Sequence, residues 1–384
     1  MTVGLILSGG GARASYQVGV LKAIAEILPD PVHNPFPVIC GASAGAINAS
    51  LLACESDRFN DAVGLLDALW EELDSDDVHR VGLGAILSSL WRLVKSLYTG
   101  GGARHKSWSL FDNTPLRELL SRVIRYERLD DRIAAGQIDA LSINTLGYTS
   151  GDNISFFQGN SRLRGWWRHR RVGIPIKLEL DHLMASTAIP GIYPAVHIHR
   201  EYFGDGAARH AAPLSPALHL GATKLFVIGV SHNPRETPGP RVHTDHSPSL
   251  AQMTSHLLNA SFIDAIEEDI ETLGRINQII DRLNPEDVNS LGLHRVDVMC
   301  ITPSQAFDAI AMKHLDCLPR SMRFLFKMLG ATQTGGGSLA SYLMFERPFI
   351  RELTETGYRD AMEMKREILE FLDLEDAASA AQTA

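Results

Sequence analysis

A serine among small residues has the features of a nucleophile. The five-residue segment 41–45 reads G-x-S-x-G around Ser43, with an apolar segment before it at 36–40 and small residues after it at 46–54. A serine between the end of a strand and the start of a helix needs a tight, strained turn, which small neighbours permit. The amides at the start of that helix, beginning with Ala44, would face an oxyanion. The pattern predicts a nucleophile elbow, although an ordinary strand-to-helix turn would also use it. The elbow glycines are Gly41 and Gly45.

Consecutive glycines form the first loop, directly after the apolar segment 3–7, which predicts a buried strand. Such a loop lets backbone N–H groups converge on an anion, which could be an oxyanion or a phosphate. The phosphate alternative has a G-x-G-x-x-A pattern in its favour. However, the next strand ends in the Ser43 elbow and not in an acidic residue, so the combination favours the oxyanion. The loop residues are Gly9, Gly10, Gly11, Ala12 and Arg13.

An aspartate follows a further predicted strand, at 197–203. Asp205 is followed by Gly206. A serine hydroxyl is a weak nucleophile at its own pKa, so a base must take its proton, and a carboxylate at a strand end can do so. Asp-Gly pairs are also common in plain turns. The interpretation of Asp205 as the base therefore depends on Ser43.

Taken together, three motifs resemble the patatin-like phospholipases: GGGAR at 9–13, GASAG at 41–45 and DGA at 205–207. The segment 185–194 is similar to the family's A-S-x-A-x-P-x-x-F/Y-P stretch, and the resemblance covers residues 3 to about 230.

This resemblance implies a three-layer α/β/α core and hydrolysis of lipid acyl esters through an acyl-enzyme. It implies a catalytic dyad of Ser43 and Asp205, with no metal or organic cofactor. It further implies an oxyanion site formed around Gly9, Gly10, Gly11 and Arg13, to which the elbow adds Ala44.

The order of the predicted elements favours an α/β fold with a mainly parallel sheet. We expect an acyl hydrolase core over 1–232, with a helical insertion near 56–135. A mostly helical extension over 233–384 would contain one strand, near 296–301. Further strands are expected at 140–144, 154–157 and 224–230, and a long helical stretch at 250–283.

Composition excludes some classes of protein. The 384 residues carry a formal net charge of -9, so nucleic-acid binding through bulk charge is not expected. The N-terminus lacks the basic region of a signal peptide, and no apolar run approaches the length of a membrane span. We therefore expect a cytoplasmic protein, unless a system that needs no cleaved signal exports it. The sequence predicts no oligomeric state.

The segment 162–177 reverses the acidic character of the chain, with six Lys or Arg, two Trp and no acid. Tryptophan beside cations suits a lipid interface, so peripheral membrane contact is one expectation. The alternative is a solvated loop whose Trp pair packs on the core. An amphipathic pattern at 83–97 is a second lipid-facing candidate, with a packed helix as its alternative. The interface candidates are Trp166, Trp167, Arg168, Arg170 and Arg171.

Other functions remain open from the sequence. His210, His219 and His232 follow Asp205, in the Ser…Asp…His order of α/β-hydrolase triads. A nucleotide-binding protein could use the 9–13 loop on a phosphate, and a catalytically silent member of the family could bind lipid without hydrolysing it.

Overall fold

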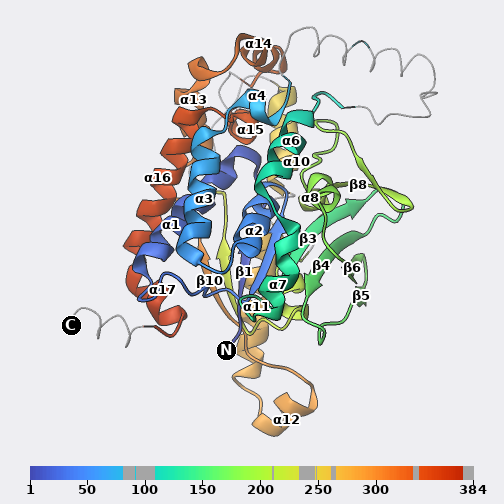
Figure 1. The fold of residues 1–384 in the computed structure, drawn as a ribbon, viewed down its shortest axis with the longest axis vertical. Helices are drawn as coiled ribbons and strands as arrows, with labels where there is room; N and C mark the ends of the chain where they lie inside the picture. The colour runs from blue at the N-terminus through green and yellow to red at the C-terminus, as the bar shows by residue number, and fades with distance from the viewer. Residues whose placement is uncertain are drawn as a thin grey trace.

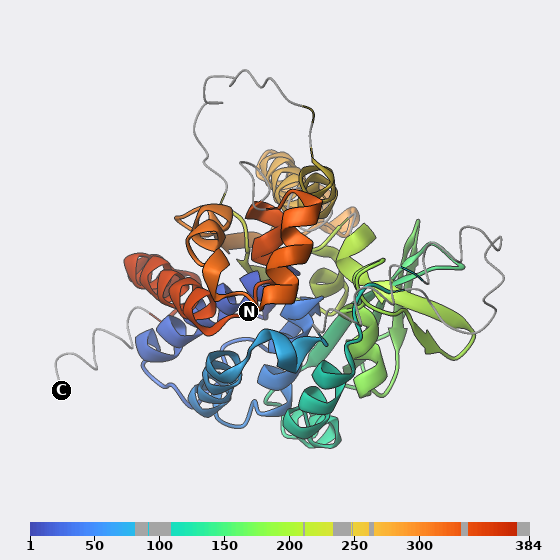
Figure 2. The ribbon, with the colours of Figure 1, turned by 90° about the horizontal axis from the view of Figure 1, so that it is seen from above.

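A ten-stranded mixed sheet forms the centre of the computed structural model, with helices on both faces (Figures 1 and 2). The main strand order is β10-β9-β1-β2-β3-β4-β6-β5. This is the α/β/α architecture expected from the sequence. The structure describes residues 1–80, 91, 109–209, 212–232, 247, 249–260, 265–331 and 337–374. Within these residues, no helix combines the length and apolarity needed to cross a membrane.

The centre of the sheet is parallel and buried on both faces. The five parallel strands β10, β9, β1, β2 and β3 lie side by side. Successive residues of β1 contribute to opposite faces: Leu5 and Leu7 join one apolar core and Ile6 the other. A continuous apolar strand is therefore required here, and the sequence has one. The strands are β1 (Val3–Leu7), β2 (Val38–Ala42), β3 (Ala140–Gly147), β9 (Lys224–Ile228) and β10 (Asp297–Ile301).

Different helices cover the two faces. The first core includes side chains of α1 (Ser15–Ile27), α2 (Ala44–Cys54) and α3 (Phe59–Glu72). The second includes side chains of α9 (Ser215–His219) and α11 (Ala265–Ile280). Each face of the sheet is thus closed from water by its own helical layer.

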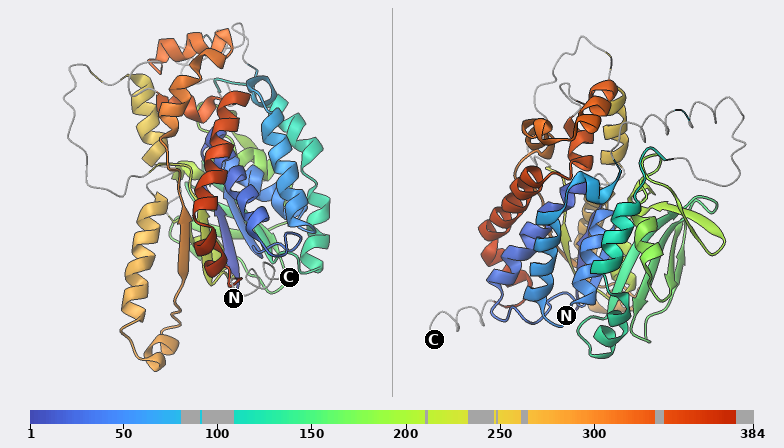
Figure 3. Two further views of the ribbon diagram at one scale, coloured as in Figure 1. Left: turned by 90° about the vertical axis from the view of Figure 1, so that its left-hand side faces the viewer. Right: turned by 45° about the horizontal axis from the view of Figure 1, so that its top comes forward.

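The C-terminal part of the chain is built into this core. β10 extends the sheet by pairing with β9, and α16 (Arg347–Glu363) packs along α1 (Figure 3). A Cβ on Gly19 would overlap the carbonyl of Thr354, and a Cβ on Gly357 would overlap that of Tyr16. Two glycines therefore allow the helix backbones to touch. β9 and β10 lie on opposite sides of the predicted division near residue 232, and they pair in one sheet.

One expected strand is two. The segment 197–203 forms an antiparallel hairpin of β7 (Val196–Ile198) and β8 (Glu201–Asp205). The chain reverses at His199, whose φ is 53°. The prediction of a single strand was wrong because no glycine or proline marks this turn.

The remaining elements complete the layers. The stretch 250–283 contains α10 and α11, with 261–264 outside the described residues. The candidate helix 83–97 also lies outside them, except Trp91. The other strands are β4 (Asn153–Gly159), β5 (Trp166–Arg168) and β6 (Arg171–Pro175). The other helices are α4 (Ser75–Val78), α6 (Thr114–Val123), α7 (Leu129–Ala134), α8 (Leu180–Ser186), α10 (Leu250–Asn259), α12 (Pro285–Ser290), α13 (Phe307–Lys313), α14 (Arg320–Leu329), α15 (Gly337–Leu343) and α17 (Lys365–Phe371).

Candidate active site

Ser43 occupies a strained turn between β2 and α2. Its φ is 53° and its ψ is -131°, a conformation that a serine adopts only where the surroundings impose it. A Cβ on Gly41 would collide with the backbone of Ala46, and one on Gly45 would overlap the carbonyl of Leu7. Small residues are therefore required on both sides of the serine. The backbone has the geometry that the elbow pattern predicts.

Strand pairing on β3 brings Asp205 to Ser43. One edge of β3 is occupied by β4, so β2 and β8 share the other edge. β2 ends with Ala42 opposite Asn144, and β8 ends with Asp205 opposite the next residue, Thr145. The two strands run in opposite directions, so their carboxyl ends meet tip to tip. Ser43 and Asp205 stand at these two ends.

Asp205 is fully buried, and burial raises the pKa of its carboxyl to about 7. Hydrogen bonding by the Ser43 hydroxyl and by the Ala207 amide lowers this pKa but does not offset burial. Oδ1 accepts the Ala207 N–H at 2.9 Å. Oδ2 is buried and accepts no well-formed hydrogen bond from the described residues. Oδ2 therefore has no competing donor among the described residues.

The glycine loop meets the serine through Gly11. Gly11 has a φ of 56° and lines the same pocket as Ser43 and Ala44. Gly9 instead lines a separate small cavity with Gly41. A Cβ on Gly10 would strike Val230. Gly11 and Ala44 are thus the members of the predicted oxyanion set that share the pocket of Ser43.

Arg13 holds the loop against α15. Its guanidinium is buried and donates to the Ser341 hydroxyl at 2.8 Å and to the Ser338 hydroxyl at 2.9 Å. It also lies 3.9 Å from the centre of the Tyr342 ring. Burial lowers the pKa of this guanidinium. The resemblance implies Arg13 around the oxyanion site; in the structure its guanidinium contacts α15 and anchors the glycine loop there.

Ser186 supports the elbow in a way that the sequence did not reveal. The Ser43 amide donates to Ser186 Oγ at 2.9 Å, and Ser186 donates to the carbonyl of Asn144 at 2.7 Å. The elbow is therefore tied to β3 at the position where β2 ends. Ser186 belongs to the segment 185–194, whose similarity to a stretch of the family was the only feature of the sequence that pointed to it.

A buried polar network supports the other side of the elbow. Asn48 donates to Gln17 at 2.9 Å and accepts from Trp70 Nε1 at 2.8 Å. Gln17 in turn donates to the carbonyl of Ser8 at 2.8 Å. The network joins α1, α2 and α3 to the end of β1. Polar residues within otherwise apolar helical patterns were the signal for it.

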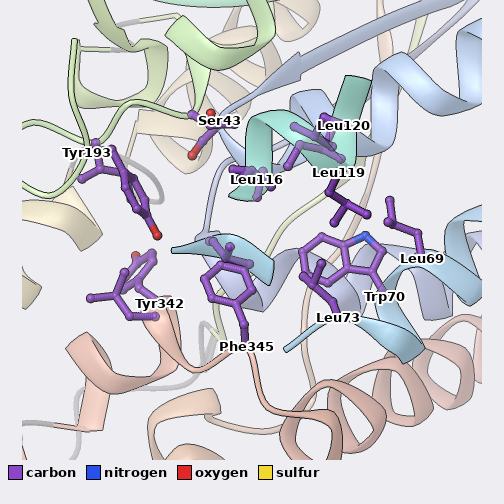
Figure 4. Close-up of a pocket in the computed structure, with 17 residues that line it drawn as sticks. Ser43, Leu69, Trp70, Leu73, Leu116, Leu119, Leu120, Tyr193, Tyr342 and Phe345 are labelled. Atoms are coloured by element: carbon purple, nitrogen blue, oxygen red, sulfur yellow. The ribbon is translucent and has the colours of Figure 1, made fainter. Parts of the chain in front are cut away.

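An apolar pocket opens from Ser43 (Figure 4). It extends between α3 and α6, and its wall is almost entirely hydrocarbon and aromatic. Among the side chains that line it are Leu69, Trp70, Leu116, Leu120, Tyr193 and Phe345. Such a lining suits an acyl chain and offers little to a charged group.

The segment 162–177 is not part of this pocket. Its residues form the β5–β6 hairpin, at the lower right of Figure 1, whereas α4 and α15, which contribute to the pocket, lie near the top. Trp166 is buried and stacks on Phe157 with ring centres 5.2 Å apart, so the expectation of Trp166 at a lipid interface is wrong. Trp167 is 76% exposed. Arg168 and Arg170 are also exposed, and Arg171 is half-buried.

The candidate triad histidines have other partners. His219 Nδ1 lies 2.8 Å from the carbonyl of Ser215, and its ring packs on Trp166. His232 Nδ1 lies 2.9 Å from the carbonyl of Pro303. Neither lines the pocket of Ser43. His210 lies outside the described residues.

Fold and site together define an α/β/α protein with a serine at a nucleophile elbow, facing an apolar pocket. The model of the patatin-like phospholipase family matches residues 5–218, which is more than half of the chain. The chain belongs to this family.

Several named proteins are similar over part of their length. A cGAMP-activated phospholipase of Pseudomonas aeruginosa is 27% identical over 221 residues, covering 58% of this chain and 57% of that protein. The calcium-independent phospholipase A2-gamma of Rattus norvegicus is 24% identical, covering 56% of this chain and 25% of that protein. A solved structure, VipD from Legionella pneumophila, aligns with a TM-score of 0.36 and 12% identity over 100% of this chain and 74% of that one. The chain spans about half of the length of the Pseudomonas aeruginosa relative and about a quarter of the length of the Rattus norvegicus relative.

Proposed function

We propose that the protein hydrolyses carboxylic esters of phospholipids or related lipids through a dyad of Ser43 and Asp205. The observation that carries this proposal is the meeting of β2 and β8 on β3, which juxtaposes the strained serine and the buried aspartate beside an apolar pocket. Membership of the patatin-like phospholipase family supports a lipid substrate.

The mechanism runs in two halves. Asp205 Oδ2 takes the proton of Ser43, whose Oγ attacks the ester carbonyl to form a tetrahedral oxyanion. The amides of Gly11 and Ala44, with the start of the α2 dipole, stabilise that charge. The alcohol leaves with the proton held by Asp205, and an acyl-serine remains. Water then gives a proton to Asp205 and its oxygen attacks the acyl-serine, which releases the fatty acid and restores both groups.

A carboxylate with a raised pKa suits this work. A base whose pKa is near 7 accepts a serine proton more readily than an aspartate with an ordinary pKa does. It also returns the proton more readily than a base with a higher pKa would. Burial of Asp205, which raises its pKa to about 7, provides this match. The apolar pocket would hold the acyl chain while the remainder of the lipid faces outward.

Phosphate binding by the glycine loop is less well supported. Gly11 faces a pocket whose wall is apolar, and the guanidinium of Arg13 is committed to α15. A nucleotide would find few polar partners there. The nucleotide activation named for the Pseudomonas aeruginosa relative concerns that protein, and would need a site elsewhere on this chain.

The test measures hydrolysis of a short p-nitrophenyl ester and a fluorogenic phospholipid by wild type, Ser43→Ala and Asp205→Asn. Ser50→Ala is a matched control, because Ser50 is buried on α2, the helix that follows Ser43, and its hydroxyl contacts Tyr126. Asp360→Asn controls for Asp205, since Asp360 is buried and bound to Tyr16.

The outcomes separate the alternatives. Loss of activity in both site variants, with both controls active, supports the dyad. An inactive Ser43→Ala with an active Asp205→Asn would place the base elsewhere. A wild type that binds lipid but hydrolyses neither substrate would make the protein a silent lipid-binding member.

A further inference from the structure

Helix α14 (Arg320–Leu329) has one buried and one exposed face. Met322, Leu325 and Phe326 are buried in the core. The opposite side carries large apolar residues in water: Phe324 is 51% exposed and Met328 is 60% exposed. We call this side the α14 outer face; it consists of Arg320, Arg323, Phe324, Lys327 and Met328.

The outer face is strongly cationic within an acidic chain. Three of its five residues are Arg or Lys, and no Asp or Glu occurs between Asp316 and Glu346. Arg323 lies 3.7 Å from the exposed Asp316, a distance at which the pair contributes little. No carboxylate among the described residues forms an ion pair with the other two cations. The positive charge is therefore available to an anionic partner.

The combination of cations and large apolar side chains favours a bilayer over an acidic protein. Cations alone would suffice to attract an acidic surface. Phe324 and Met328 gain from leaving water only if the partner accepts hydrocarbon as well, as the boundary between headgroups and acyl chains does. A helix with basic residues beside exposed apolar ones has the composition of an interfacial helix.

The position of α14 fits this partner. α14 lies at the top of the molecule in Figures 1 and 3, at the end where α4 and α15 also lie. α4 contributes Val78 and α15 contributes Tyr342 and Leu343 to the pocket of Ser43. A membrane held at α14 would thus be at the pocket's end of the molecule.

We propose that the α14 outer face docks the protein on an anionic phospholipid bilayer. Arg320, Arg323 and Lys327 contact lipid phosphates, while Phe324 and Met328 enter the boundary with the acyl chains. Docking would bring the pocket to ester-bearing lipid; this benefit rests on the proposed hydrolase function, whereas the docking itself does not.

The experiment measures binding of the full chain to phosphatidylcholine vesicles with and without phosphatidylglycerol, using Ser43→Ala so that the lipid stays intact. The test variant carries Arg320→Gln, Arg323→Gln and Lys327→Gln. The matched control carries Arg168→Gln, Arg170→Gln and Arg171→Gln, which removes the same charge from the β5–β6 hairpin. A third protein, Phe324→Ser with Met328→Ser, tests the apolar part.

We expect the α14 charge variant to partition roughly 100-fold less onto anionic vesicles, since each cation near such a surface contributes about a factor of five. The hairpin control should bind like its parent, and added salt should weaken the parent more than the α14 variant. The Phe324→Ser, Met328→Ser protein should keep its salt dependence but bind several-fold less.

Several results would overturn the proposal: unchanged binding of the α14 charge variant, loss of binding in the hairpin control instead, or no binding of the parent to anionic vesicles. If the parent does not bind anionic vesicles, a protein becomes the better candidate for the partner of the α14 outer face. Hydrolysis of the short soluble ester in an otherwise wild-type background separates docking from catalysis. If the α14 variants hydrolyse this ester normally but no longer bind anionic vesicles, the loss of binding does not come from misfolding, and docking through α14 is supported. If no protein hydrolyses the ester but the vesicle binding changes as expected, the hydrolase proposal fails and the docking proposal stands.

Discussion

The β5–β6 hairpin and the pocket end of the molecule both combine cations with aromatic residues, yet the fold places them differently. In the hairpin, Trp166 turns into the core and Trp167 turns out, at the edge of the sheet beyond β4. At the pocket end, α14 exposes Phe324 among cations near the elements that line the pocket of Ser43. Similar compositions therefore lead to different expected roles, because the fold decides how far each region lies from Ser43.

Removing Ser43, the proposed nucleophile, should give the largest difference between the two regions. Ser43→Ala is expected to lower kcat for a short ester at least about 10⁴-fold, because the proposed acyl-enzyme forms on the Ser43 hydroxyl. Substitutions in the hairpin should not approach this loss. Steady-state kinetics with circular dichroism as a check of folding would measure it; residual activity within tenfold of wild type would contradict Ser43 as nucleophile.

The pH profile should report Asp205. A base must be deprotonated, and burial raises the pKa of Asp205 to about 7, so kcat/KM should fall about tenfold per pH unit below that value. The folded protein also retains a proton that an unfolded aspartate has lost. The free energy of unfolding should therefore decrease as pH rises from about 4 to 7.

Asp205→Asn removes the titrating carboxyl group, and with it the expected pH dependence of both kcat/KM and the free energy of unfolding. We expect an inactive protein that is more stable than wild type above pH 7, with the difference shrinking toward pH 4. Urea unfolding at several pH values would measure this difference. A variant that is less stable than wild type at every pH would show that burial of the charge is not the dominant influence on Asp205.

Arg13→Met tests how the glycine loop is held. The change removes the donors to Ser338 and Ser341 while keeping an unbranched side chain. We expect about a tenfold to 100-fold lower kcat with little change in KM, since the loop loses its register with Ser43. Arg13→Lys should rescue little, because an ammonium cannot reproduce the planar contacts. An unchanged kcat would make Arg13 purely structural.

The pocket wall should select acyl chain length. Leu119→Trp adds bulk from α6 where the pocket extends away from Ser43. Long-chain p-nitrophenyl esters should lose about tenfold in kcat/KM while short ones are little affected, because only a long chain reaches this wall. Equal losses for all chain lengths would place the acyl chain elsewhere.

The smallest effect is expected within the hairpin. Trp167→Ala should leave stability within about 0.5 kcal/mol and activity unchanged, since its ring is 76% exposed. Trp166→Ala should cost about 3 kcal/mol or more, because it empties a buried site against Phe157. Thermal unfolding of the two variants would compare them directly, and equal stabilities would refute the inward and outward assignment.

Local pattern was sufficient for much of the architecture. The strand 3–7, the glycine loop and the elbow at 41–45 are adjacent in sequence, so residue types alone determine a strand, a tight turn and a helix start. The strand near 296–301 was also readable from its apolar run. The hairpin turn at His199 was not, because nothing but tertiary pairing selects a positive φ at a histidine.

Tertiary structure decided which of these pieces meet. The sequence nominated Ser43 and Asp205, but only the sharing of one edge of β3 by β2 and β8 places them tip to tip across 162 residues of chain. The tertiary structure likewise places Arg13 against α15, which is far away in sequence, and places Trp166 in the core. Contacts between distant segments depend on the packing of the whole sheet and its helices, and no local pattern of residue types contains that information.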